Sequence, residues 1–236
     1  MFTFKPNSFF NFSANKIIMK KIFSLLLLLA LSFSALAQDR PAFWDDIQNF
    51  KKSDADHPPP KSAILLIGSS SFTKWTDVGT YFPNKTFINR GFGGSTLKDL
   101  NFYSDDLLKP YSPKQIIIYC GENDFAADQD VASKEVFNRF KKFYAAIRKY
   151  YPKILVDYIS IKFSPSRENL WPKMAKTNQL IENFMKRKPN ADYIDITKSM
   201  ETPDGKIRKD LFLEDMLHMK PEGYDLWKKE MEPYLK

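Results

Sequence analysis

The 236-residue sequence is poor in residue types that stabilise or functionalise a small protein by themselves. It has one cysteine, Cys120, which excludes an internal disulfide. It has two histidines, His57 and His218, which argues against a histidine-based metal centre. No arginine-rich tract is interleaved with aromatic residues, which argues against a nucleic acid partner. We therefore expect no metal, and a fold stabilised by an apolar core.

Long apolar runs are also scarce, and the one at residues 22–34 lies near the N-terminus. Two lysines precede it, and Ala35-Leu36-Ala37 follows with the small residues that signal peptidases recognise. The pattern predicts a signal peptide over residues 1–37, with Met19 as an alternative start. An uncleaved anchor is the alternative, but the run is short for a membrane span. No cysteine follows the run directly, which excludes a lipoprotein. We expect an exported protein, periplasmic or extracellular, with no stable membrane insertion after cleavage.

The net charge of the chain, +8, falls to +4 when the predicted signal peptide is removed, because residues 1–37 contain four lysines and no acid. Such an excess is typical of a solvated surface. About 200 residues remain, enough for one well-buried domain and too few for two.

Short apolar runs alternate with longer amphipathic segments along the rest of the chain. Strands are expected at residues 63–67, 86–88, 115–120, 154–161 and 192–196. Helices are expected at residues 96–108, 132–150, 169–187 and 221–234. Because strands without polar alternation are covered on both faces, the pattern predicts an α/β protein: a three-layer α/β/α sandwich around a five-stranded parallel sheet.

We expect one globular domain over residues 62–236, preceded at residues 38–61 by a helix and a linker. Apolar residues at helical spacing predict the helix at residues 41–52, and a proline-rich polar stretch at residues 54–61 predicts the linker. No internal repeat or second domain is evident.

Polar and glycine-rich blocks follow the first three predicted strands, where an open parallel sheet binds its ligands. The first block, residues 68–72, reads Gly-Ser-Ser-Ser-Phe and places Ser70 at a strand-to-helix turn, where it is either a nucleophile or a helix cap. The second, residues 89–96, is glycine-rich but fits no phosphate-binding pattern. The third, residues 121–124, carries Asn123, whose amide can donate a hydrogen bond into the same cleft.

A fourth block, residues 215–218, lies near the C-terminus and contains Asp215 and His218. An aspartate three residues before a histidine can hold one ring nitrogen and leave the other free to accept a proton. A helix-capping or surface pair is the alternative interpretation. His57, among acids and prolines, is expected to be a solvated loop residue.

The order of the four blocks resembles the SGNH hydrolase superfamily, also called GDSL-type lipases and esterases, over about residues 62–234. The resemblance implies the flavodoxin-like fold of that family, with Ser70 as nucleophile and Asp215 orienting His218 as general base. It also implies an oxyanion hole formed by the backbone N–H groups of Ser70 and Gly94 and the side chain of Asn123. Trp75 and residues 162–172 further resemble a bacterial branch related to platelet-activating-factor acetylhydrolase.

One residue departs from the family pattern, since Ser69 stands where the family has aspartate. The departure leaves Ser69 and Ser71 as alternative nucleophiles, although only Ser70 keeps the Gly-x-Ser spacing.

The resemblance implies an esterase that forms an acyl-Ser70 intermediate without a metal or organic cofactor. The expected substrate is a small ester, with a short acyl or acetyl group, or an acylated glycan. Four aromatic residues near the predicted cleft are compatible with such a substrate: Phe72, Trp75, Phe92 and Phe125. For Phe92 and Phe125, packing between loops is the alternative. Lys162 and Arg167 attract an acidic substrate or are simply solvated. The alternatives are a lysophospholipase or thioesterase-type acylhydrolase and a non-catalytic glycan-binding module of the same fold.

Overall fold

The computed structural model describes residues 40–236, of which Ala42–Lys236 form one compact unit. The predicted signal peptide, residues 1–37, lies outside the described residues. No helix in the described part of the chain is long and apolar enough to cross a membrane.

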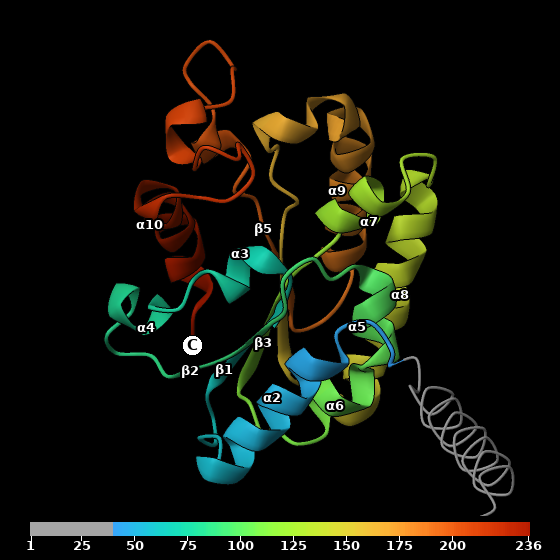
Figure 1. Ribbon diagram of the computed structural model, residues 1–236, viewed down its shortest axis with the longest axis vertical. Coiled ribbons are helices and arrows are strands. Elements are labelled where there is room, and N and C mark those ends of the chain that lie inside the picture. Colours follow the sequence, from blue (N-terminus) through green and yellow to red (C-terminus); the bar gives the residue numbers. More distant parts are fainter. Residues whose placement is uncertain (1–39) are drawn as a thin grey trace, which may run out of the picture. The chain divides into compact units, whose positions relative to one another are not determined.

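A parallel sheet lies at the centre of this unit (Figure 1). Its strands are β1 (Ile64–Gly68), β2 (Phe87–Gly91), β3 (Gln115–Tyr119), β4 (Leu155–Ile159) and β5 (Ala191–Ile194). Their spatial order is β2-β1-β3-β4-β5, and every neighbouring pair is parallel. Five predicted strands and a parallel sheet are therefore confirmed. Because all strands run the same way, the blocks that follow them meet at one edge.

Two apolar clusters cover the two faces of the sheet. Strand β1 divides between them, with Leu65 and Ile67 in one cluster and Ile64 and Leu66 in the other. The first cluster packs against α2 (Trp44–Asp56), α5 (Leu97–Phe102), α6 (Ser104–Leu108), α8 (Ser133–Tyr150) and α9 (Trp171–Met185). The second packs against α3 (Ser70–Thr73), α4 (Val78–Tyr81) and α10 (Pro221–Met231). Figure 1 shows α4 and α10 on one side and α8 and α9 on the other, which confirms the three layers.

Three predicted boundaries are corrected by the structure. The helix expected at residues 96–108 is two helices, α5 and α6, because Tyr103 between them leaves the helical conformation (φ −94°, ψ 19°). The helix expected from residue 169 begins as a 3₁₀ turn, η1 (Pro165–Leu170), before α9. Helix α2 continues to Asp56 and so includes the first residues of the predicted linker.

Two short helices at the carboxyl edge show no apolar periodicity in the sequence, although a helix was expected to begin near Ser70. They are α3, directly after β1, and α7 (Glu122–Ala127), directly after β3. A helix of four to six residues spans too few turns to show apolar periodicity. Three more 3₁₀ turns lie in the C-terminal region: η2 (Lys198–Met200), η3 (Lys209–Leu211) and η4 (Glu232–Tyr234).

Candidate active site

The first block turns sharply from β1 into α3. The Ser69 amide donates to the Tyr119 carbonyl at 3.1 Å, which joins this turn to the end of β3. A Cβ atom at Gly68 would lie 1.9 Å from the same carbonyl oxygen, so only glycine allows the close approach of the two chains. The turn places Ser70 as the first residue of α3, at the carboxyl edge of the sheet.

Exposure distinguishes the three adjacent serines. Ser69 and Ser71 are buried, at 3% and 2% exposed, whereas Ser70 is half-buried and open to a ligand. Ser69 occupies the N-cap position of α3, but its side chain makes no capping hydrogen bond. The block therefore does not serve as a side-chain cap, and accessibility favours Ser70 among the three candidate nucleophiles.

The second block folds as a loop beside Ser70. A Cβ atom built on Gly93 would lie 3.9 Å from the Ser70 Cβ atom, so the two residues are neighbours. Gly94 has a φ of +85°, a conformation that L side chains rarely adopt. Ser95 attaches the loop to β1 by donating from Oγ to the Gly68 carbonyl at 3.2 Å. Within residues 40–236 no acceptor is found for the backbone N–H groups of Ser70 and Gly94.

The third block brings Asn123 to the same loop. Its Nδ2 atom donates to the Ser95 carbonyl at 3.0 Å, and its Oδ1 atom accepts a hydrogen bond from Arg167 at 3.0 Å. The next residue, Asp124, accepts from the Leu97 amide at 2.9 Å and from Arg139 at 2.8 Å. The side chains of Asn123 and Asp124 therefore attach the third block to the second block and to the start of α5.

The fourth block forms the expected pair. His218 Nδ1 lies 2.6 Å from Asp215 Oδ2, and the amides of Leu217 and His218 both donate to Asp215 Oδ1 at 2.9 Å. Burial acts to raise the pKa of Asp215, but these hydrogen bonds outweigh it and lower the pKa to about 2. A carboxylate that stays ionised fixes the ring orientation and leaves Nε2 facing away from Asp215.

Contacts from two other segments position the fourth block. Met216 adopts a left-handed conformation with a φ of 53°, and its carbonyl accepts hydrogen bonds from both the amide and the hydroxyl of Ser166 at 3.0 Å. Downstream, Tyr224 of α10 donates from its hydroxyl to the Ser71 carbonyl at 2.8 Å. The segment that follows His218 is thus anchored to the helix that carries Ser70. Contacts made by Ser166 and Tyr224 therefore connect the fourth block with the segments next to the first and third blocks.

Lys162 and Arg167 do not form the solvated or substrate-facing pair considered from the sequence. Lys162 is 1% exposed, and its Nζ atom lies 2.5 Å from the Glu122 carboxylate. Arg167 is mostly buried and contacts both Asn123 and Glu122. Glu122, which the sequence analysis did not single out, is 4% exposed and is the centre of this network. The sequence signal that could have identified Glu122 was an acidic residue between an apolar strand and Asn123.

The aromatic residues considered as cleft-lining are all internal. Phe72, Trp75, Phe92 and Phe125 are each 0% exposed. Trp75 stacks on Tyr224 with ring centroids 4.8 Å apart, and Phe92 packs edge-on against Phe43 at 5.3 Å. The cleft-lining interpretation is therefore wrong for all four side chains, and the packing interpretation of Phe92 and Phe125 is confirmed.

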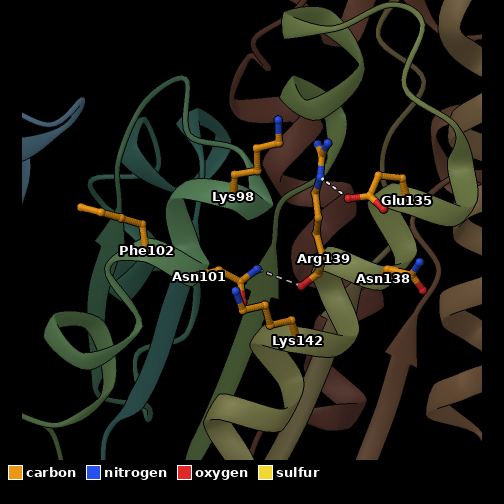
Figure 2. Close-up of a pocket in the computed structure, with 7 residues that line it drawn as sticks. All are labelled: Lys98, Asn101, Phe102, Glu135, Asn138, Arg139 and Lys142. Carbon is orange, nitrogen blue, oxygen red and sulfur yellow. Dashed lines mark hydrogen bonds and ion pairs between the residues drawn. The ribbon is translucent and has the colours of Figure 1, made fainter.

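A separate cavity of about 450 Å³ lies between α5 and α8 (Figure 2). Its walls carry three cations, Lys98, Arg139 and Lys142, and one carboxylate, Glu135, which pairs with Arg139. None of the predicted site residues lines it, and it lacks a nucleophile beside a base. In the described part of the chain, no group of three or more His, Cys, Asp or Glu side chains is placed to hold a metal ion.

One family model matches most of the chain. The model of the GDSL-like Lipase/Acylhydrolase family matches residues 67–226, a range that contains all four blocks. None of the curated proteins matches the chain.

Solved structures with the same fold come from bacteria and a fungus. A Streptococcus pneumoniae protein described as a platelet activating factor is 21% identical, with a TM-score of 0.70, and the match covers 89% of this chain and 99% of that one. A Bacteroides fragilis protein described as an acylhydrolase is 19% identical, with a TM-score of 0.70, covering 81% and 96%. A carbohydrate esterase family 3 protein from Talaromyces cellulolyticus is 13% identical, with a TM-score of 0.55, covering 73% and 95%. At these identities the likeness concerns the fold, and the predicted fold is confirmed.

Proposed function

Since the chain belongs to the GDSL-like lipase/acylhydrolase family and is thus an ester-cleaving hydrolase, we propose that Ser70 attacks a short acyl ester and carries the acyl group. The observation that carries the proposal is the Asp215–His218 pair, with its 2.6 Å contact, in a segment that Tyr224 joins to the helix that carries Ser70. Among the serines of the first block, Ser70 alone is open to a ligand.

In the acylation step, His218 accepts the Ser70 proton on Nε2 while the serine oxygen bonds to the ester carbonyl carbon. Asp215 stabilises the imidazolium that forms, because its carboxylate is already ionised and hydrogen-bonded to Nδ1. His218 then gives the proton to the leaving alcohol, which departs as the tetrahedral intermediate collapses to acyl-Ser70.

The negative charge on the former carbonyl oxygen requires donors that are already in place. The N–H groups of Ser70 and Gly94 have no acceptor within residues 40–236, and the Asn123 amide has a second N–H besides the one directed at Ser95. We assign these three groups to the oxyanion hole. In the second half-reaction, water activated by His218 attacks the acyl carbon and releases the acid, so this chemistry calls for no metal or organic cofactor.

For the substrate, we propose an acetyl or other short acyl ester, with an O-acetylated carbohydrate as the natural form. Support comes from the similar fold of the carbohydrate esterase family 3 protein and from the small size of the described unit. A lysophospholipase or thioesterase-type acylhydrolase is the second candidate, supported by the similar fold of the B. fragilis protein described as an acylhydrolase.

The activity experiment uses the purified chain with p-nitrophenyl acetate, butyrate and decanoate, and intact mass after a fluorophosphonate probe. We expect Ser70→Ala to lower kcat at least about 10⁴-fold and to abolish labelling. Ser69→Ala and Ser71→Ala are the matched controls and should keep both. Preference for decanoate would favour the second candidate. An unlabelled, inactive wild-type protein would instead favour the non-catalytic glycan-binding module.

We also propose that the protein is exported, on the basis of the apolar run and cleavage pattern in residues 1–37. N-terminal sequencing of the protein recovered from a bacterial periplasm or culture medium should begin at Gln38. A cytoplasmic product that retains residues 1–37 would contradict export without affecting the esterase proposal.

A further inference from the structure

The amide side chain of Asn123 is held at both of its polar atoms. Arg167 can only donate, so it faces Oδ1, at 3.0 Å from Nη2. The Ser95 carbonyl can only accept, so it faces Nδ2, also at 3.0 Å. These two partners define which way the amide points. One of its N–H groups is left to donate to a substrate.

Arg167 is itself held by a buried carboxylate. Its Nη1 atom lies 3.5 Å from Glu122 Oε1, and the side chain is 16% exposed. This contact is an ion pair without a hydrogen bond, since Arg167 Nη1 has no hydrogen-bond partner among the described residues. Glu122 accepts hydrogen bonds from Lys162 at 2.5 Å, Ser164 at 2.5 Å and Tyr119 at 2.9 Å. The guanidinium is therefore confined between Glu122 on one side and Asn123 on the other.

The charges of this cluster do not cancel. Glu122 supplies one negative charge, whereas Lys162 and Arg167 supply two positive charges. No other carboxylate of residues 40–236 forms an ion pair with either cation. Within this mostly buried cluster, which contacts Oδ1 of Asn123, the positive charge is in excess, and the ionised Asp215 is the further acid that acts on Lys162. Charges act more strongly in such surroundings than in water.

A hydrogen bond from an arginine to Oδ1 makes the Nδ2 group of the same amide a stronger hydrogen-bond donor. The guanidinium draws electron density toward Oδ1, which makes the Nδ2 hydrogens more positive and strengthens the hydrogen bond they give to an anion. Because the amide is already oriented, it does not have to reorganise when the oxyanion forms.

We propose that Arg167 is a positioning residue of the hydrolase: it orients and polarises the Asn123 amide, and the Glu122–Lys162 pair holds its guanidinium in place. The inference rests on the proposed function, because it takes Asn123 as a donor to the oxyanion. Arg167 acts through Asn123, so its contribution depends on the presence of that side chain.

The test is a double-mutant cycle on p-nitrophenyl acetate hydrolysis with Arg167→Met and Asn123→Ala. In the wild-type background, we expect Arg167→Met to lower kcat about tenfold, less than the loss of a whole oxyanion donor, with KM changed by less than about twofold. In the Asn123→Ala background, the same substitution should lower kcat by less than about twofold.

The fold should survive Arg167→Met, because Glu122 keeps its pairing with Lys162. Thermal melting of each variant checks this. Arg167→Lys provides a second double-mutant cycle that keeps the positive charge. It should lower kcat by less than Arg167→Met does, and this decrease should also disappear in the Asn123→Ala background. Arg148→Met is the matched control. Arg148 likewise ties loops together, donating to the carbonyls of Ile154 and Asn190, but these precede β4 and β5 at the opposite edge of the sheet. It should leave kcat unchanged in both backgrounds.

The possible failures are separable. An active wild type in which Arg167→Met and Arg167→Lys each lower kcat by the same factor with and without Asn123 would overturn the inference and leave the esterase intact. An effect on KM or melting temperature alone would overturn it as well, since that is the mark of a structural role. A wild type that neither hydrolyses the ester nor reacts with the fluorophosphonate probe would overturn the proposed function, and the inference with it.

Discussion

Two buried carboxylates flank Asn123, and their pKa values shift in opposite directions. Glu122 and Asp124 are 4% and 1% exposed, and each contacts an arginine. Burial acts to raise the pKa of Glu122, but Lys162 and Arg167 lower it below its ordinary value. Burial raises the pKa of Asp124, because the Leu97 amide and the single Arg139 do not compensate for it. The two cations beside Glu122 lower its pKa by more than burial raises it, whereas the single cation beside Asp124 does not.

A third carboxylate extends the comparison. Asp157 of β4 is 1% exposed and is hydrogen-bonded by the neutral Gln115 side chain, with no ion pair within residues 40–236. Burial raises its pKa from 3.8 to about 7, with Asp192 adding to the rise and Gln115 opposing it. Of the three carboxylates, only Glu122, which contacts two cations, has a lowered pKa.

The largest effect is expected when Glu122 is neutralised. Glu122→Gln leaves Lys162 and Arg167 without a buried anion and should lower the free energy of unfolding by about 3–5 kcal/mol. Urea denaturation at pH 7 measures the change. Lys162→Met combined with Glu122→Gln removes the unpaired lysine and should recover part of the loss. Equal stability of Glu122→Gln and wild type would contradict the view that the cations depend on this carboxylate.

Asp157→Asn is expected to act through pH. Asp157 has a raised pKa in the folded state, so its stabilising contribution is complete below about pH 4 and is lost as the pH rises through about 7. Asparagine stays neutral and should make the protein more stable than wild type by about 2–4 kcal/mol at pH 8, with little difference at pH 4. Melting curves between pH 4 and 8 measure this. Parallel curves for the two proteins would show that Asp157 does not titrate in this range.

A smaller loss is expected at Asp124. Asp124→Asn keeps one acceptor, for the Leu97 amide, but replaces the charged oxygen that accepts from Arg139 with an NH₂ group, so it should cost about 1–2 kcal/mol. Arg139 retains its contact with Glu135. The measurement is urea denaturation beside Glu122→Gln. A loss as large as that of Glu122→Gln would remove the distinction between the two carboxylates.

The smallest effect is expected at Glu135, the outer partner of Arg139. Its side chain is 54% exposed and lies 3.3 Å from Arg139 Nε, so Glu135→Gln should change the free energy of unfolding by no more than about 0.5 kcal/mol. Denaturation at low and high salt tests this. A loss above 1 kcal/mol would mean that Arg139 relies on its exposed partner as much as on its buried one.

Much of the fold could be predicted because apolar burial is encoded locally. Strands such as Gln115–Tyr119 are buried along their whole length and therefore read as continuous apolar runs. Long helices such as Ser133–Tyr150 bury one face and show the helical period. The four-residue α3 and the break at Tyr103 depend on packing between distant segments, and no local period marks them.

The candidate site divides in the same way. Asp215 and His218 lie within one turn of chain, so their contact could be anticipated from spacing. The roles of Ser70, Gly94, Asn123, Asp215 and His218 follow from the family resemblance and stay predictions. Arg167 was interpreted as a surface or substrate-binding cation, because the sequence gives no sign that residue 167 folds back onto residue 123.

The sequence by itself determined the parallel α/β architecture and the position of three polar blocks directly after strands, and it showed a fourth block with an Asp-x-x-His spacing near the C-terminus. Only the tertiary structure decided which serine is exposed, that the four aromatic side chains are internal, and that Lys162 and Arg167 surround a buried acid behind Asn123. The physical reason is range. Strand and helix patterns arise from neighbours a few residues apart, whereas burial and charge pairing depend on segments separated by 40 residues or more, such as Glu122 and Lys162.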